Sequence, residues 1–138
     1  MSFLLDTNVV SEWVKPQPNA AVIAWLDEVD EDRVFLSVVT LTELSYGIKR
    51  LAAGKRRKRL EDWLEHELTL RFEGRILDID QTVANACGEL LAEREAAGRP
   101  FGAMDAYLAA TAQVHRLILV TRNDSDFEGT VRYLNPWS

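Results

Sequence analysis

Short apolar segments alternate with longer amphipathic segments along the whole chain, and this alternation restricts the possible folds more than any other feature. Residues 3–5 are fully apolar, which is typical of a strand covered on both faces. The candidate strands are residues 3–5, 33–37, 75–79, 117–121 and 131–135. The candidate helices are residues 7–15, 19–29, 39–54, 55–70, 81–98 and 102–115. This order is typical of βαβ units, and it predicts an α/β fold whose parallel sheet carries helices on both faces.

Prolines and glycines mark where several of these helices are expected to end. Pro16 and Pro18 follow the first helix, and a residue before proline disfavours the helical conformation. Gly54 is the expected end of the third helix, and Gly98, with Pro100 just beyond it, closes the fifth. No repeat, low-complexity tract or linker interrupts the pattern, so we expect the 138 residues to form one domain.

The composition excludes several classes of protein. Hydrophobic residues make up 47% of the chain and charged residues 28%, which argues against disorder. The formal net charge of −6 argues against a protein that coats nucleic acid through a broad basic surface. It still allows an enzyme that binds a phosphodiester through a metal ion, because a bound cation reverses the local field.

The chain also carries signs of the compartment in which it works. The single cysteine, Cys87, allows neither an intramolecular disulfide nor a thiolate metal cluster, which fits a reducing cytosol. Asp6 and Glu12 interrupt the apolar N-terminal run, so no signal peptide is expected. No stretch approaches the roughly 20 apolar residues that a membrane span needs. We therefore expect a cytoplasmic protein without a membrane segment.

Acidic residues recur where the expected strands end. Asp6 follows the first strand, Glu43 lies in the helix after the second, and Asp124 and Asp126 follow the strand before the last. Asp105 heads the apolar face of the Ala-rich helix. Each of them has a local explanation, as a helix cap, a solvated helix border or a turn residue.

Taken together, these acids indicate a shared site. The predicted topology brings them to the edge of the sheet where the strands end, and chemistry gathers at that edge in such sheets. Two carboxylates about 5 Å apart repel each other by roughly 3 kcal/mol at an effective dielectric constant near 20. Hard oxygen ligands suit Mg²⁺ or Mn²⁺, and the two histidines, His66 and His115, offer no competing site. The sequence therefore predicts an acidic site that holds a metal ion.

Four motifs, in this order and spacing, resemble those of PIN-domain ribonucleases. They are LLDTNVVSE, TLTELSYGI, MDAYLAATA and LVTRNDSDF. Within that family the chain is similar to VapC-type toxins of toxin–antitoxin pairs, and the closing YLNPW resembles the FitB-like branch. The resemblance covers residues 3–137 and implies a three-layer fold with a parallel sheet of about five strands. It also implies an acidic site for one or two Mg²⁺ or Mn²⁺ ions.

The resemblance implies a role for each acid of the site. Asp6, Glu43 and Asp105 match the three firmest acidic positions of the family, as catalytic residues and metal ligands. The family pattern places a fourth acid shortly after the last core strand. Asp126 fits this position best, and Asp124 is the alternative.

Three further residues match positions that support the site in the family. Thr121 and Asn123 match residues that support it through hydrogen bonds, and Asn8 matches a positioning amide. The implied reaction is metal-dependent hydrolysis of an RNA phosphodiester by in-line attack of water, which leaves a 5′-phosphate and a 3′-hydroxyl. No lysine or histidine is needed as a base.

The partners follow from the resemblance as well. VapC-type proteins are toxins of type II toxin–antitoxin systems, and they form homodimers that a VapB-type antitoxin inhibits. A larger hetero-oligomer on operator DNA is a further expectation. The antitoxin tail is expected to lie across a hydrophobic groove and to block the acidic site. An arginine that enters the carboxylate cluster would replace the charge of the metal ion.

Two other functions fit parts of the sequence. A haloacid-dehalogenase-type phosphatase also uses an aspartate after its first strand, but it normally needs a second aspartate two positions on, where this chain has Asn8. A catalytically inactive PIN scaffold that only binds a partner would have lost acids, and no acid is lost here. We favour the nuclease and keep the inactive scaffold as its main alternative.

The basic run KRRKR, residues 55–59, has two interpretations. It is either a solvated turn between two helices or a basic ridge that holds an RNA backbone beside the acidic cleft. Two of the four tryptophans, Trp13 and Trp63, lie on expected amphipathic helices and would serve as anchors in a partner groove. Packing against the core is the alternative role for at least two of the four.

Overall fold

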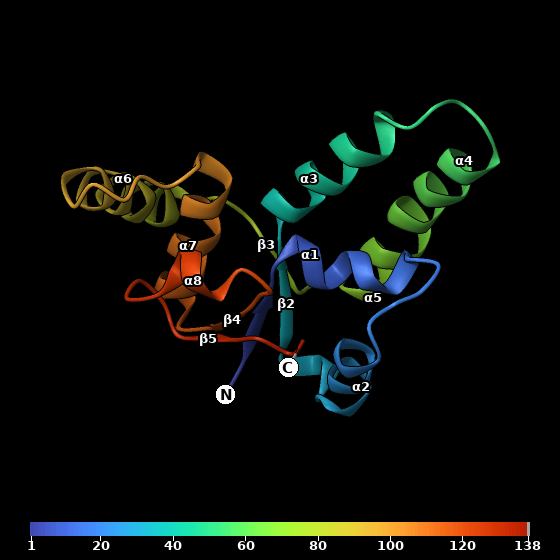
Figure 1. The fold of residues 1–138 in the computed structure, drawn as a ribbon, viewed down its shortest axis with the longest axis horizontal. Helices are drawn as coiled ribbons and strands as arrows, with labels where there is room; N and C mark the ends of the chain where they lie inside the picture. The colour runs from blue at the N-terminus through green and yellow to red at the C-terminus, as the bar shows by residue number, and fades with distance from the viewer. Residues whose placement is uncertain (138) are drawn as a thin grey trace.

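The computed structural model describes residues 1–137, and their core is a five-stranded sheet (Figure 1). Its strands are β1 (Phe3–Leu5), β2 (Val34–Ser37), β3 (Ile76–Leu77), β4 (Ile118–Val120) and β5 (Tyr133–Leu134). The strand order is β3-β2-β1-β4-β5, and every pair is parallel. The parallel α/β fold is therefore confirmed. Ser138, the last residue of the expected domain, lies outside the described residues.

Helices fill the connections between the strands. The longer ones are α2 (Ala20–Glu28), α3 (Val38–Lys49), α4 (Lys55–Asp62), α6 (Gln81–Ala96) and α7 (Ala103–His115). The shorter ones are α1 (Thr7–Val10), the 3₁₀ helices η1 (Ser11–Val14) and η2 (Glu31–Arg33), the π-helix η3 (Trp63–Leu68), α5 (Thr69–Arg71) and α8 (Asp124–Phe127). None of the helices in residues 1–137 has both the length and the apolar composition needed to span a bilayer.

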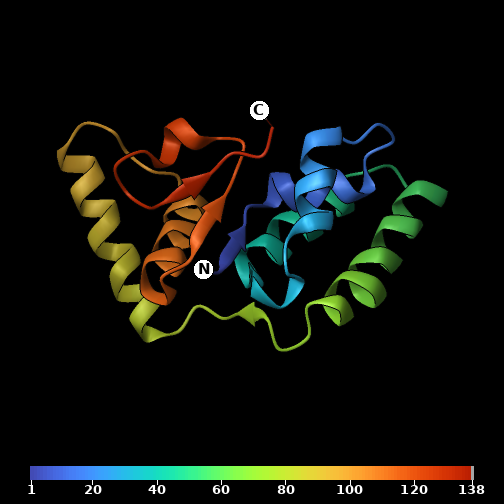
Figure 2. The ribbon, with the colours of Figure 1, turned by 90° about the horizontal axis from the view of Figure 1, so that it is seen from below.

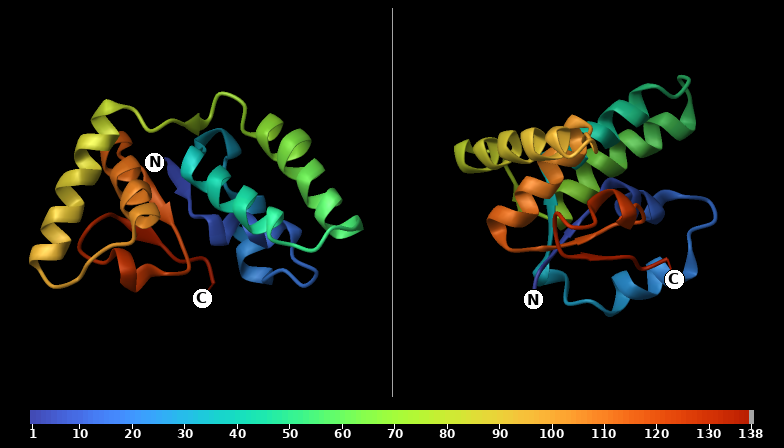
Figure 3. Two further views of the ribbon diagram at one scale, coloured as in Figure 1. Left: turned by 90° about the horizontal axis from the view of Figure 1, so that it is seen from above. Right: turned by 60° about the vertical axis from the view of Figure 1, so that its left-hand side comes forward.

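Two hydrophobic cores lie on opposite faces of the sheet, because successive strand residues point in opposite directions. Leu4 and Leu119 pack with α6 and α7, whereas Leu5 and Val120 pack with α1, α2 and η3. Figures 2 and 3 show α6 and α7 on one side of the sheet and the helices α1 to α4 on the other. This three-layer arrangement is the one that the resemblance implies.

Two of the expected helices are shorter or more divided than the sequence predicts. The first, residues 7–15, is one turn of α1 followed by η1. The third ends at Lys49 rather than at Gly54, and Gly54 instead precedes α4. Of the two interpretations of residues 55–59, the solvated turn is wrong, because these residues form the first turns of α4, within the expected helix 55–70.

The expected helix 55–70 contains a π-helical segment that the sequence does not predict. Its apolar residues Leu60, Leu64, Leu68 and Phe72 recur every four residues, and all four contact the core or lie within it. An α-helix has about 3.6 residues per turn, so a strict spacing of four drifts around its surface. The wider π turn of η3 offsets this drift. Leu68 and Phe72 lie in the core cluster that contains Leu5, and Leu64 packs against that cluster.

Candidate functional site

The candidate site lies where the strand order reverses, at the carboxyl ends of the central strands β1 and β4. The chain runs outward from β1 through β2 to β3 and then returns to the other side of β1 with β4. The Asp6 N–H donates to the carbonyl of Val120 at 2.9 Å, so Asp6 and Thr121 leave neighbouring strands side by side. Ligands of open α/β sheets bind at such a switch point.

Asp6 is the buried centre of this site, with 5% of its surface exposed. One carboxylate oxygen, Oδ1, accepts a hydrogen bond from the Thr7 N–H at 2.7 Å. The other, Oδ2, accepts from the Thr121 hydroxyl at 2.7 Å and from the Asn8 amide at 3.4 Å. Asp6 therefore caps α1, as its local explanation predicts, and it also joins a polar network. All three donors are neutral.

The electrostatics of Asp6 and Asp105 differ from those of ordinary carboxylates. Burial raises the pKa of Asp6 to about 6, against the hydrogen bonds from Thr121 and Thr7, and the charges of Asp105 and Glu43 add to the rise. Burial also raises the pKa of Asp105, and the neighbouring carboxylates of Asp126 and Glu43 contribute. The charges of Asp105 and Glu43 therefore act on Asp6, and the charges of Asp126 and Glu43 act on Asp105.

Glu43 reaches the site from α3, at the half-buried helix border that the sequence predicts. Its Oε1 accepts a hydrogen bond from the Thr7 hydroxyl at 2.6 Å, and that hydroxyl lies 3.2 Å from the hydroxyl of Thr40. Thr7 therefore links Asp6 and Glu43, a role that the sequence analysis missed. The available signal was a hydroxyl directly after Asp6 in the first motif.

The loop after β4 contains the two candidates for the fourth acid. Asp124 accepts a hydrogen bond from the side chain of Asn135 at 3.3 Å. Asp126 is exposed, and its negative charge contributes to the raised pKa of Asp105. This difference favours Asp126 as the fourth acid of the cluster. Asn123 lies beside the site, where its N–H donates to the Thr121 hydroxyl at 3.0 Å.

The acids of this cluster are not ion-paired within the part of the chain that the structure describes. None of the ion pairs formed by residues 1–137 includes Asp6, Glu43, Asp105 or Asp126. In the same part of the chain, no three acidic, histidine or cysteine side chains converge into a ready-made metal cage. The donor set nevertheless fits Mg²⁺, because this ion keeps several waters and needs only one or two carboxylates.

A groove beside the acids contains the basic run and two of the tryptophans. Its larger part, about 710 Å³, lies between η1 and α4 and includes Trp13, Trp63 and Lys58 in its lining. An apolar continuation of about 230 Å³ reaches Thr7 and Glu43. All four tryptophans also pack against the core. Trp13 and Trp63 therefore both stabilise the fold and line the groove. His66 and His115 are exposed and lie outside the site, as expected.

The fold and the acidic switch point together define the class of protein. Residues 3–132 match the PIN domain family, and the chain belongs to this family. It is similar to the toxin FitB of Neisseria gonorrhoeae, with 42% identity over 135 residues and 97% of each chain covered. It is also 38% identical to the VapC ribonuclease Y4jK of Sinorhizobium fredii, covering 97% of this chain and 96% of the relative.

Solved structures agree with this assignment. The chain superposes with a TM-score of 0.93 on a chain of the structure of FitAB bound to an IR36 DNA fragment. The two chains are 38% identical, and the match covers 99% of this chain and 96% of the other. The resemblance to PIN-domain toxins of the VapC type, first stated on four motifs, is therefore confirmed over nearly the whole chain.

Proposed function

We propose that the protein is a metal-dependent endoribonuclease that acts as the toxin of a type II toxin–antitoxin pair. One observation carries the proposal. The buried carboxylate of Asp6 lies with those of Glu43, Asp105 and Asp126 at the switch point, and it has only neutral hydrogen-bond donors. Uncompensated charge of this kind calls for a bound cation. Relatives named as ribonucleases and toxins support the reaction class.

Asp6, Glu43, Asp105 and Asp126 would hold Mg²⁺ or Mn²⁺. When bound, the ion neutralises these carboxylates, lowers the pKa of water and offsets the charge that develops on a phosphodiester under attack. The products of such hydrolysis are a 5′-phosphate and a 3′-hydroxyl.

The chain's own residues prepare the site for this chemistry. The Thr121 hydroxyl and the Thr7 N–H fix both oxygens of Asp6 and favour its charged form. The Thr7 hydroxyl orients Glu43, which otherwise has a flexible side chain. Asp105 lies in the first turn of α7, where the helix dipole favours a negative charge. The four acids come from four different segments, and none of them forms an ion pair with a side chain of residues 1–137.

The groove next to the site is the proposed seat of the antitoxin. A neighbour in structure is named as a complex, FitAB bound to DNA, and we propose a VapB-type antitoxin, a toxin homodimer and an operator-DNA complex for this chain as well. The apolar part of the groove suits a peptide and reaches Glu43, so a seated tail would also cover the acids. Lys58 and Arg59 on the rim favour an acidic segment in that tail. As an RNA-cleaving toxin, the protein would act in the cytoplasm.

The test is cleavage of total RNA in the presence of Mg²⁺ or Mn²⁺ by the protein and by its Asp6→Asn variant. Calorimetry on the same two samples measures metal binding. We expect binding and cleavage in the unmodified protein, and loss of both in the variant. Metal binding without cleavage of any RNA would favour the inactive scaffold instead, and no binding in either sample would contradict the metal site.

A further inference from the structure

Arg94, near the end of α6, joins two loops, residues 99–101 ahead of α7 and residues 126–130 at the end of α8. The first leads into the helix of Asp105, and the second begins at Asp126. Its Nε donates to the carbonyl of Arg99 at 2.7 Å, in the loop that leads into α7. Its Nη1 donates to the carbonyl of Asp126 at 3.1 Å and to the hydroxyl of Thr130 at 3.0 Å. One side chain therefore spans two segments about thirty residues apart, each next to an acid of the site.

An aromatic contact strengthens the same bridge. The guanidinium of Arg94 lies over the ring of Phe101, 3.7 Å from its centroid. Phe101 in turn packs against the buried Phe127, with ring centroids 5.8 Å apart. Phe101 lies just before α7, and Phe127 directly follows Asp126, so this stack joins the same two loops.

We propose that Arg94 is a positioning residue that sets the separation of the Asp105 and Asp126 carboxylates. The inference rests on the proposed function, in which these two carboxylates hold a metal ion and their separation therefore matters. Arg94 touches neither carboxylate and forms none of the ion pairs of residues 1–137, so its positive charge does not neutralise the site. Its N–H groups donate to two carbonyls and a hydroxyl of the two loops, so its role is to hold the loops in position.

The planar guanidinium is suited to this task and an ammonium is not. The N–H bonds of its separate nitrogens point in fixed directions. Nε therefore donates to Arg99 on one side, while Nη1 donates to Asp126 and Thr130 on the other. A lysine keeps the charge over Phe101 but has one nitrogen, which cannot reach both loops in the same way. Arg94→Lys is therefore expected to behave more like Arg94→Ala than like the unmodified protein.

The experiment compares Arg94→Ala and Arg94→Lys with the matched control Arg99→Ala, which removes an exposed arginine side chain but leaves the backbone carbonyl that Arg94 binds. Calorimetry measures Mn²⁺ affinity, and steady-state cleavage of an RNA substrate separates kcat from KM. We expect both Arg94 variants to lose about tenfold in Mn²⁺ affinity and in kcat, as is typical for partners behind metal ligands, with KM unchanged. Arg99→Ala is expected to retain both values.

Hydrogen exchange of residues 124–131 supplies a readout that a general loss of stability does not imitate. In the metal-free protein we expect faster exchange there in the Arg94 variants, with exchange in β1 and β4 unchanged. Thr130→Val, which removes one acceptor, is expected to show a smaller change in the same direction. Unchanged Mn²⁺ affinity and exchange in Arg94→Ala would overturn the inference while leaving the nuclease proposal intact. Failure of the unmodified protein to bind Mn²⁺ would overturn both.

Discussion

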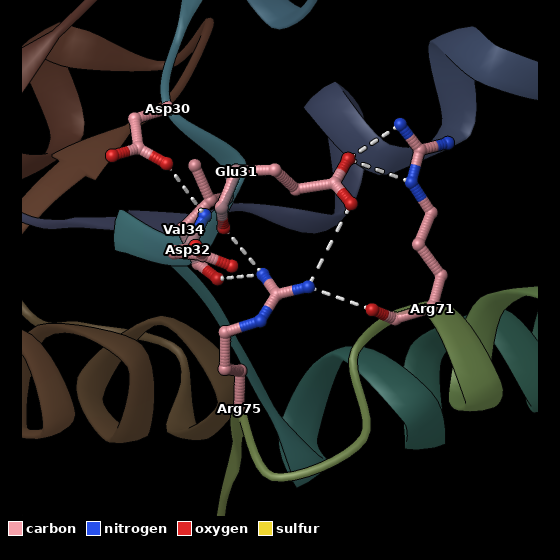
Figure 4. Close-up of polar contacts among 6 residues, drawn as sticks. All are labelled: Asp30, Glu31, Asp32, Val34, Arg71 and Arg75. Carbon is pink, nitrogen blue, oxygen red and sulfur yellow. Dashed lines mark hydrogen bonds and ion pairs between the residues drawn. The ribbon is translucent and has the colours of Figure 1, made fainter.

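Two clusters of charge in this molecule are treated in opposite ways. At the amino end of β2, Glu31 is met by the guanidinium groups of Arg71 and Arg75 (Figure 4). Arg75 also donates at 2.6 Å to each of three carbonyls, those of Glu31, Val34 and Arg71. At the other end of the sheet, the carboxylates of Asp6 and Glu43 accept hydrogen bonds from neutral donors.

The same contrast appears within one motif. Asp6 and Glu12 both belong to LLDTNVVSE, and they are only 5% and 2% exposed. Burial works to raise the pKa of Glu12, but the Lys15 ammonium and the Asn19 N–H outweigh it and hold the pKa below its ordinary value. Asp6 has no such partner, and its pKa is raised.

The difference separates charges that hold the fold together from charges that are kept for a ligand. Where the chain needs a charge only for stability, it supplies the opposite charge itself. Around Asp6 it supplies orientation without neutralisation, and under the proposed function a bound cation would relieve the repulsion that the folded state retains. The following changes test this distinction, from the largest expected effect to the smallest.

Asp6→Asn is expected to reduce RNA cleavage by about 1000-fold, because a metal ligand is lost from the transition state. The fold is expected to remain, since an amide oxygen still accepts the Thr7 N–H and the costly buried charge is gone. Cleavage assays and urea unfolding of the metal-free protein measure the two effects. A variant that is clearly less stable than its parent would show that Asp6 is structural.

Arg75→Met is expected to lower the free energy of unfolding by about 3 kcal/mol, because it leaves three carbonyls without their charged donor. The methionine retains packing against Phe72, over which the guanidinium lies. Urea unfolding measures the loss, and cleavage per folded molecule is expected to stay unchanged. A loss of activity without loss of stability would contradict the idea that the cluster around Arg75 serves stability alone.

Much of the fold could be predicted from the sequence because its signals are local. Apolar runs such as Phe3–Leu5 and the alternation of strands and helices specify a parallel sheet without knowledge of distant contacts. The π-helical segment could not be predicted in this way. Leu60 and Phe72 are compatible with a regular helix, and no local pattern marks the wider turn between them.

The acids of the site could be predicted because strand ends converge at one edge, but their supports could not. Asp6 and Glu43 were identified from their positions after strands, whereas Thr7 resembles any residue at a helix start. Arg94 lies outside all four motifs, and its role follows only from the approach of two loops. Local signals give the residues that carry charge, and tertiary contacts give those that orient them.

Asp126→Asn is expected to lower cleavage by about 100-fold, whereas Asp124→Asn should change it by less than about threefold. The charge of Asp126 contributes to the raised pKa of Asp105, whereas Asp124 accepts a hydrogen bond from Asn135. The two variants have the same change in charge and lie two residues apart, so each is the control for the other. The reverse order of effects would make Asp124 the fourth acid.

The metal-free protein is expected to become more stable as the pH falls from 7.5 to 5. The pKa of Asp6 is about 6 in the folded protein and 3.8 in its ordinary state, so the folded state binds the proton more tightly between these values. The gain from this group is about 1.5 kcal/mol at pH 5. Urea unfolding of the protein and of Asp6→Asn, over this range, isolates the contribution, since the variant lacks it. Equal slopes would show that the charge of Asp6 is compensated.

The smallest expected effect concerns the pair formed by Arg71 and Glu31. These side chains are 45% and 40% exposed, so solvent screens them, and a double-mutant cycle with Arg71→Met and Glu31→Gln is expected to give a coupling of about 0.5 kcal/mol. In 1 M salt this coupling should vanish, because both charges lie within reach of counterions. Asp6→Asn is expected to stabilise the metal-free protein at pH 7, because it removes a buried charge, and this gain should persist in the same salt. If salt removed both effects equally, the acidic site would be an ordinary surface cluster, and the contrast between the two ends of the sheet would lose its basis.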